Sequence, residues 1–285
     1  MQKSAQPSAS LLLILTPAQK RSFRKKLYDY FALHGRDLPW RHTITPYRIV
    51  VSEIMLQQTQ VDRVITRFEA FVAAFPTFEA LDAASLADVY AVWQGLGYNR
   101  RALALKRIAA LVVHEYNNTV PQSVDILATF PGIGRATASS ICAFAFDMPA
   151  VFVETNIRSI FIHEFYNDRE QVPDADIIHL AGQTIDTLHP RTWYSALMDY
   201  GTMLKKTHPN PSRKSAAHTM QSPFKGSRRQ IRGAILKQLS ACPNQTAAQL
   251  HTHISGSSVA TLREIADALC AEGMVSKTNS RYSIA

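Results

Sequence analysis

The stretch that decides the fold is Phe130-Pro131-Gly132-Ile133-Gly134-Arg135-Ala136-Thr137-Ala138. A large apolar residue, a Pro-Gly-Ile-Gly turn and a run of small helix formers predict a helix that ends in a tight hairpin before a second helix begins. The glycines permit positive φ and close approach of another backbone. The first amides of the second helix have no acceptor within that helix, so they suit a phosphate oxygen. The stretch therefore predicts a helix-hairpin-helix that binds a DNA backbone, with an ordinary helix C-cap and connection as the alternative.

The composition agrees with a DNA-binding protein but does not require one. The 285 residues carry a formal net charge of +9, which suits a polyanionic partner, although a merely basic protein would have the same charge. Cys142, Cys242 and Cys270 lie far apart and match no zinc or disulfide spacing. The apolar run at 11–15 is too short to span a bilayer, and Thr16-Pro17 predicts the start of a helix. We expect a cytoplasmic, nucleoid-associated monomer without a membrane partner.

Three parts follow one another along the chain. Residues 16–204 show apolar residues at three- and four-residue spacing, which predicts an all-α domain in which 150–153 is the main strand-like run. Residues 205–229 contain seven Lys and Arg and no acidic residue. They predict a basic, extended connector, either a solvated linker or a strand lying on DNA phosphates. Residues 230–285 predict three helices and a short hairpin, a winged-helix-like module that either binds DNA or packs as an accessory part.

Five motifs occur in one order along the first of these parts: Leu38-Pro39-Trp40, Ser52-Glu53-Ile54-Met55-Leu56-Gln57-Gln58-Thr59-Gln60-Val61, Gly95-Leu96-Gly97-Tyr98, the hairpin, and Val153-Glu154-Thr155-Asn156-Ile157-Arg158. This series resembles the helix-hairpin-helix DNA glycosylase superfamily that includes endonuclease III. The Met-Leu-Gln-Gln-Thr-Gln block and Gly-Leu-Gly-Tyr are similar to the adenine-specific mismatch glycosylases. The resemblance covers residues 16–204 and implies an all-α, two-lobed helix-hairpin-helix glycosylase fold, followed here by the winged-helix-like module.

The resemblance implies cleavage of an N-glycosidic bond, for which two carboxylates are candidates. Glu53 lies in an apolar helical stretch, so burial is expected to raise its pKa toward a value useful for a general acid. The corresponding family residue protonates adenine; a salt-bridged surface Glu is the alternative. Glu154 stands where the superfamily has Asp, and it keeps the charge that stabilises an oxocarbenium-like sugar while its extra methylene displaces the carboxylate. Asn156 matches the adenine-specific branch and is expected to orient Glu154 or a water.

The resemblance also assigns residues to DNA binding. Gln58 and Tyr98 fit an amide wedge and an aromatic that intercalates beside the unpaired base, with core packing as the alternative for Tyr98. Thr59 and Leu96 are expected to touch the opposite base, which is 8-oxoguanine in the family's usual substrate. Gln57 belongs to the same polar interruption of a buried-looking helix. The DNA backbone would meet the hairpin at Pro131, Gly132, Ile133, Gly134, Arg135 and Ala136.

Ala136 decides the type of reaction that the resemblance implies. Bifunctional members of the superfamily have a Lys just after the hairpin, and its amine forms a Schiff base with the sugar. An alanine side chain cannot do this. We therefore expect a water-using, monofunctional glycosylase.

Two departures from the family concern accessory parts. Most of these glycosylases hold a four-iron cluster with four Cys, and the positions at that spacing are Lys205, Ser212, Ser215 and Gln221 here. None is a thiolate, so we expect no iron–sulfur cluster and no other metal, apart from a monovalent cation that hairpin carbonyls could hold. The tail cannot be the nudix-like domain that adenine-specific enzymes usually add. Recognition of the opposite base is then expected to rest on residues 16–204.

Together these observations predict a monofunctional DNA glycosylase of base excision repair. We expect it to flip and hydrolytically remove a mispaired base from double-stranded DNA, with adenine opposite 8-oxoguanine or guanine as the preferred substrate. Two alternatives remain open. One is a glycosylase for mismatched thymine or uracil or for an oxidised pyrimidine, and the other is a catalytically inactive DNA-binding protein.

Overall fold

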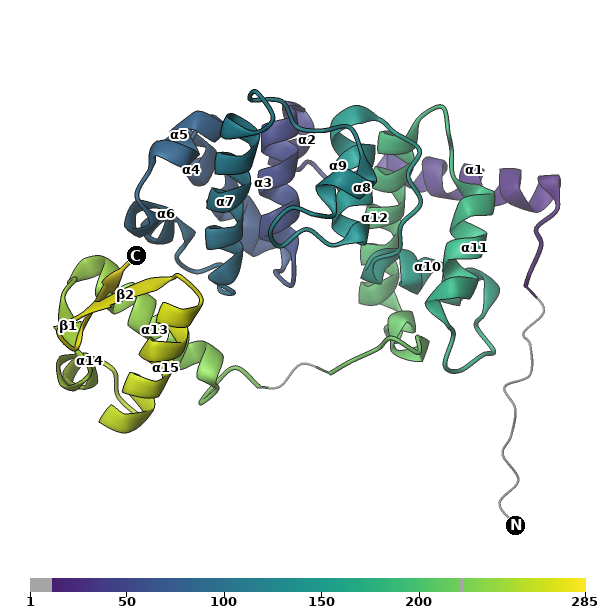
Figure 1. Cartoon of the computed structure of the whole chain (residues 1–285). Helices are drawn as coiled ribbons and strands as arrows, with labels where there is room; N and C mark the ends of the chain where they lie inside the picture. The colour runs from purple at the N-terminus through teal and green to yellow at the C-terminus, as the bar shows by residue number, and fades with distance from the viewer. Residues whose placement is uncertain (1–11, 221–222) are drawn as a thin grey trace, which may run out of the picture. The chain divides into compact units, whose positions relative to one another are not determined.

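The computed structural model describes residues 12–220 and 223–285, and its described part is predominantly helical (Figure 1). It divides into two compact units. One consists of the residues up to Arg36 together with Cys142–Thr219, and the other of Asp37–Ile141 together with Met220–Ala285. The predicted all-α, two-lobed fold is confirmed. Within the described ranges, no helix has the length and apolar character needed to cross a membrane.

The first unit is built around long helices with an aromatic core. Its helices are α1 (Pro17–His34), α10 (Thr155–Phe165), α11 (Asp174–Thr184), α12 (Pro190–Thr207) and the short 3-10 helix η1 (Pro211–Lys214), and α9 (Arg135–Phe146) runs through both units. Phe23 of α1 packs edge-on against Trp193 of α12, with ring centroids 6.0 Å apart. The predicted start of α1 is confirmed, because Thr16 forms a capping box with Gln19 and Pro17 is the first helical residue.

The strand-like run at 150–153 differs from its prediction, since it forms no strand. It is an irregular segment that leads into α10. Phe152 and Val153 are buried, and the Phe152 ring stacks on Tyr194 with centroids 4.1 Å apart. Packing against α12 therefore explains the apolar side chains that suggested a strand.

The second unit begins with a group of shorter helices. They are α2 (Pro39–His42), α3 (Pro46–Leu56), α4 (Val61–Ala74), α5 (Phe78–Ala83), α6 (Leu86–Trp93), α7 (Arg100–His114) and α8 (Val124–Leu127). Several start at a Ser or Thr whose side chain accepts a hydrogen bond from the third helical amide: Thr45, Thr77, Ser85 and Ser123. Phe71 of α4 meets Trp93 of α6 edge-on at 5.8 Å in the core.

The C-terminal module, residues 228–285, has the predicted winged-helix-like arrangement. It contains α13 (Arg228–Ala241), β1 (Gln245–Thr246), α14 (Ala247–His253), α15 (Val259–Ala271), β2 (Val275–Thr278) and β3 (Arg281–Ile284). The strands form one antiparallel sheet in the order β1-β3-β2, with Gln245 opposite Tyr282 and Val275 opposite Ile284. Figure 1 shows the three helices around this small sheet. Leu239, Leu262 and Tyr282 are among its buried side chains.

The predicted extended connector at 205–229 differs from the structure in its first half. α12 continues to Thr207, and η1 follows at Pro211–Lys214. Val172 then pairs with this segment: its amide donates to the Lys214 carbonyl at 2.8 Å, and its carbonyl accepts from the Ala216 amide at 2.9 Å. Burial of Pro211 and Ser215 accompanies this pairing. The segment is thus a packed part of the first unit, which low apolar content concealed in the sequence.

Candidate functional site

The predicted hairpin lies between α8 and α9 in the second unit. The Ile133 amide donates to the Phe130 carbonyl at 3.1 Å, which closes the turn, and the Ile133 side chain is buried. Gly132 has φ +73°, and a Cβ there would lie only 2.9 Å from the Ala104 Cβ. A glycine is therefore required at this position for both conformation and space.

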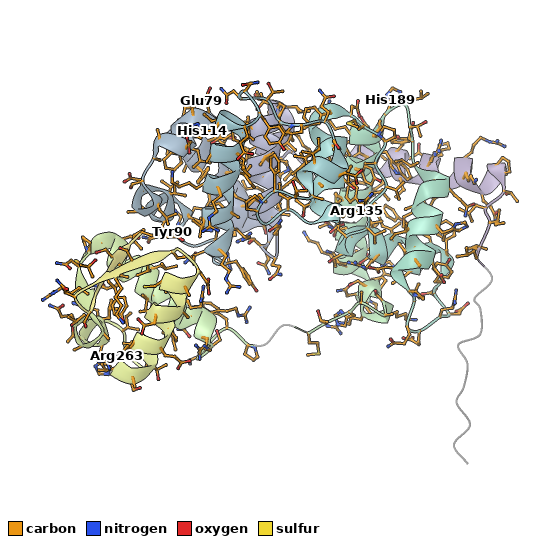
Figure 2. The ribbon with its side chains drawn as sticks, viewed as in Figure 1. Glu79, Tyr90, His114, Arg135, His189 and Arg263 are labelled. Atoms are coloured by element: carbon orange, nitrogen blue, oxygen red, sulfur yellow. The ribbon has the colours of Figure 1, made fainter. Side chains whose placement is uncertain are left out.

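The outer side of the hairpin is open. Gly134 has no positive φ, and a Cβ added there would meet no atom within 4 Å, so its freedom is not needed for the fold. The first helical bond of α9 is from the Ala138 amide to the Gly134 carbonyl at 2.9 Å. Arg135 (Figure 2) and Ala136 are exposed. The Arg135 ion pair with Asp125 is exposed on both sides (75% and 81%), so a phosphate can compete for the guanidinium.

The Gln-Gln-Thr-Gln block forms the turn between α3 and α4, as its interruption of the apolar pattern predicts. Gln58 is exposed and has φ +55°, a conformation that costs energy for a residue with a Cβ. Thr59 is half-buried. The Gln57 side-chain amide donates to the Gly132 carbonyl at 3.1 Å and lies 3.4 Å from the Thr137 hydroxyl. Gln57 therefore ties the turn to the hairpin and leaves Gln58 pointing to solvent.

The Gly-Leu-Gly-Tyr motif forms a tight loop after α6. Gly95, Gly97 and Tyr98 all have positive φ, at +90°, +70° and +48°. The Trp93 indole donates to the Gly97 carbonyl at 3.1 Å. Tyr98 is half-buried, but the Leu96 side chain is only 1% exposed. The expectation that Leu96 touches a DNA base is thus not met by this conformation, because the side chain packs into the core beneath the loop.

Both loops are held by one buried residue that sequence reasoning missed. Arg101 is 8% exposed, and its guanidinium reaches the ends of both segments. Nη1 lies within hydrogen-bond distance of the carbonyls of Ile54 (3.0 Å), Met55 (2.7 Å) and Gln57 (2.5 Å), and Nη2 of those of Leu96 (3.2 Å) and Gly97 (2.9 Å). Burial lowers the pKa of Arg101 to about 10, which still leaves it charged at neutral pH.

A signal for Arg101 exists in the sequence. It shares one helical face of α7 with Leu105, Ile108 and Val112, all of which are fully buried. A charged residue in such an apolar row must find partners inside the protein. The row indicates a buried arginine, although it does not identify the carbonyls that receive it.

Glu53 lies in the second half of α3. It is half-buried, and its chain neighbours Ser52 and Ile54 are fully buried. The predicted setting, a carboxyl group on an otherwise buried helix, is confirmed. The expected rise of its pKa stays a prediction.

Glu154, in the first unit, is the N-cap residue of α10. Its Oε1 accepts from the amides of Asn156 at 2.6 Å and Ile157 at 3.0 Å, and its Oε2 accepts from the Asn156 side-chain amide at 3.3 Å. The predicted orienting role of Asn156 thus has a direct contact. The backbone of Glu154 is extended (φ −127°, ψ −178°), so the longer side chain bends back to cap the helix as an Asp ordinarily would.

The carboxylate of Glu154 is half-buried and partly desolvated. Burial raises the pKa of its carboxyl, against the opposing effects of the Lys205 charge and of the hydrogen bonds from Ile157 and Asn156. Burial in turn lowers the pKa of Lys205 on α12. At Gly201, a Cβ would lie 2.6 Å from the Asn156 carbonyl oxygen, so glycine lets α12 approach the start of α10. A half-buried carboxylate is thus held at a helix N-terminus, where the helix dipole favours its ionised form.

The positions that correspond to cluster cysteines do not fit an iron–sulfur cluster. Lys205 offers an amine, and Ser212 and Ser215 offer buried hydroxyls; Gln221 lies outside the described residues. The Ser212 hydroxyl donates to the Asn210 side chain at 2.8 Å, which leaves it engaged within the protein. Iron–sulfur clusters need thiolates. Across residues 12–220 and 223–285, no three His, Cys, Asp or Glu side chains are grouped as a metal site.

Comparison with known proteins agrees with this fold. A family model described as HhH-GPD superfamily base excision DNA repair protein matches residues 51–178. A thermostable thymine-DNA glycosylase has a similar structure, with a TM-score of 0.58 at 24% identity over 65% of this chain and 86% of that one. A non-covalent endonuclease III–DNA complex gives a TM-score of 0.54 at 19% identity over 74% and 91%. The structural likenesses show the helix-hairpin-helix glycosylase fold, and the family model agrees with it.

A curated relative narrows the class. The chain is 34% identical, over 284 residues, to a protein named adenine DNA glycosylase from Mycolicibacterium smegmatis, and the match covers 91% of this chain and 95% of that protein. The chain therefore belongs to the adenine DNA glycosylase family. The predicted enzyme class, a DNA N-glycosylase of base excision repair with DNA as its partner, is confirmed.

Proposed function

We propose that this chain acts as a monomer and hydrolyses the N-glycosidic bond of adenine mispaired with 8-oxoguanine or guanine, without an iron–sulfur cluster. The observation that carries the choice of adenine is the similarity over almost the whole chain to an adenine DNA glycosylase. Arg101 holds both the Gln-Gln-Thr-Gln turn and the Gly-Leu-Gly-Tyr loop. This arrangement supports recognition of a mismatched base pair by the two segments.

Glu53 acts as the general acid in the proposed reaction. Its proton neutralises the leaving adenine while the bond between base and sugar breaks and the electron pair leaves with the base. The half-buried position of Glu53 on α3 supports this role, because the carboxyl group is partly desolvated and still reachable.

Glu154 stabilises the positive charge that develops on the sugar. Its carboxylate is held by two amides of α10 and by Asn156 before substrate arrives, so little reorganisation is needed in the transition state. The Asn156 side-chain oxygen is buried and has no hydrogen-bond partner among the described residues. It can accept a hydrogen bond from the water that attacks the sugar, whose proton passes to a carboxylate.

DNA contacts divide between positioning and reading. The exposed outer side of the hairpin, from Gly134 to Ala136, receives a backbone phosphate. Gln58 fills the space of the flipped base, and Tyr98 inserts beside the unpaired one. Ala136 provides no amine for a Schiff base, which supports hydrolysis without strand cleavage.

The test is single-turnover base release on four duplexes that contain A opposite 8-oxoguanine, A opposite G, T opposite G, and U opposite G. We expect adenine release from the first two, and we expect E53Q to abolish release while it retains DNA affinity. Release of pyrimidine alone would move the activity to the thymine or uracil branch. Binding without release from any duplex would support an inactive DNA-binding protein. The same preparation should be colourless and free of iron.

A further inference from the structure

Within the second unit, the C-terminal module is joined to α7 by a carboxylate shared between two arginines. Glu272, just after α15, accepts two hydrogen bonds from Arg100 of α7, both at 2.6 Å. It also accepts two from Arg232 of α13, at 2.8 and 2.5 Å. Hydrogen bonds from the two arginines lower the pKa of Glu272 to about 2. The carboxylate is therefore charged at neutral pH, and the contact is lost only in strong acid.

The module also contacts the Gly-Leu-Gly-Tyr loop. Arg229, at the start of α13, donates from Nη1 to the Tyr98 hydroxyl at 2.6 Å. The Arg229 guanidinium carbon lies 5.7 Å from the centroid of the Tyr98 ring, and that of Arg101 lies 5.5 Å from the same centroid. The aromatic side chain is thus fixed at its backbone by Arg101, which also reaches the Tyr98 carbonyl at 3.4 Å, and at its tip by the module.

A surface hollow of about 510 Å³ joins the module to the hairpin. Ala271 and Glu272 of the module line it together with Pro131 and Gly132 of the hairpin, and the remaining lining residues come from α7. The module therefore borders two of the elements that the proposed function assigns to DNA, the hairpin and the Gly-Leu-Gly-Tyr loop. An accessory part placed for stability alone has no need to border them.

We propose that Arg229 is a positioning residue for Tyr98, so that the C-terminal module takes part in reading the mismatch. The proposal rests on the proposed function, in which Tyr98 inserts beside the unpaired base. A tyrosine that is held only by its backbone samples several rotamers. Fixing one of these rotamers in the complex costs conformational entropy on binding. The hydrogen bond from the charged Arg229 to the Tyr98 hydroxyl restricts the rotamers before DNA binds, and so reduces this entropy cost. Its effect falls on recognition of the duplex and not on the chemical step.

The test combines two variants that break the same bond from opposite sides. R229A removes the donor, and Y98F removes only the acceptor while it keeps the aromatic ring. We expect each to weaken affinity for a duplex with A opposite 8-oxoguanine about tenfold, and we expect R229A to leave the maximal rate of base release unchanged. The double variant is expected to be no weaker than either single one, because the bond can be lost only once. R229K should restore part of the affinity.

R263A is the matched control. It removes the same charge from the same module, and Arg263 is exposed on α15 (Figure 2). We expect less than a twofold change. Additive losses from R229A and Y98F would overturn the proposal, since Arg229 would then act on DNA independently. Tighter binding by R229A would also overturn it, since the contact would then be an inhibitory one. Because affinity is measured separately, absence of adenine release in the unmodified protein would contradict the proposed function alone.

Discussion

Replacement of Glu154 by Gln separates two effects of its negative charge, the cost to folding stability and the contribution to catalysis. Gln keeps an oxygen that can accept from the amides of Asn156 and Ile157, so the cap of α10 is retained. Without a negative charge, stabilisation of the sugar cation is lost, and we expect single-turnover release of adenine to slow about a hundredfold to a thousandfold. Stability is expected to change in the other direction. Because the pKa of Glu154 is raised on folding, the charged carboxylate at neutral pH costs folding free energy, and a neutral side chain removes that cost.

The matched control is E164Q on the same helix. Glu164 pairs with Lys26 at 2.7 and 2.9 Å, and Tyr200 donates to it at 3.2 Å. Its loss is expected to lower stability by at most about 1 kcal/mol and to leave base release unchanged. Thermal unfolding at pH 7 and base release with excess enzyme measure both quantities. The reasoning fails if E154Q releases adenine within threefold of the unmodified rate, or if it unfolds at a lower temperature than E164Q.

Three further predictions concern the second unit. R101K is expected to lower the free energy of unfolding by about 2–3 kcal/mol and to slow base release, because an ammonium cannot serve all the carbonyls of both loops; urea unfolding measures the first effect. G132A is expected to lower the free energy of unfolding by about 1–2 kcal/mol, since φ is +73° at this position and a Cβ would lie 2.9 Å from the Ala104 Cβ. G134A, in contrast, should weaken DNA binding without a change in unfolding temperature. For E272Q, the deficit in unfolding temperature should be present above pH 4.5 and vanish as the pH falls toward about 2, because the pKa of Glu272 is lowered on folding; a constant deficit over that range would contradict this.

The fold could be predicted from local signals because each one had a local cause. Thr16-Pro17 begins a helix by capping and fixed φ, and the Gln-Gln-Thr-Gln block ends one by its polarity. The three helices predicted within residues 230–285 are observed, and the last of them is α15 (Val259–Ala271). The prediction failed at 150–153 and after Thr207, where the conformation depends on distant partners. Val172, for example, pairs with Ser215, more than forty positions later. The local pattern of apolar residues around either position does not indicate this pairing.

The sequence identified candidate residues for the reaction and for DNA binding, but not the residues that hold them in place. Gln58, Tyr98 and Glu154 were assigned through motifs, and the structure gives each a distinct setting. Arg101, which holds the two loops, and Arg229, which holds the Tyr98 hydroxyl, belong to no motif. Arg229 contacts Tyr98 across 131 positions of sequence, so only the packed structure reveals the pair. A motif identifies the groups that meet the substrate, whereas the residues that hold those groups are found from contacts.

The two departures from the family pattern, at 154 and 205, influence each other through their opposite charges. Glu in place of Asp at 154 and Lys in place of the first cluster Cys at 205 are fifty-one positions apart in sequence. In the fold, α12 approaches the start of α10 at Gly201, one turn before Lys205. The Lys205 charge is the largest of the influences that oppose burial and lower the pKa of Glu154, and Glu154 in turn raises that of Lys205. A free cysteine at 205 would be a neutral thiol near neutral pH and would supply no positive charge to favour ionisation of Glu154. Lysine at 205 therefore removes a cluster ligand and at the same time supports the carboxylate on which the proposed chemistry depends.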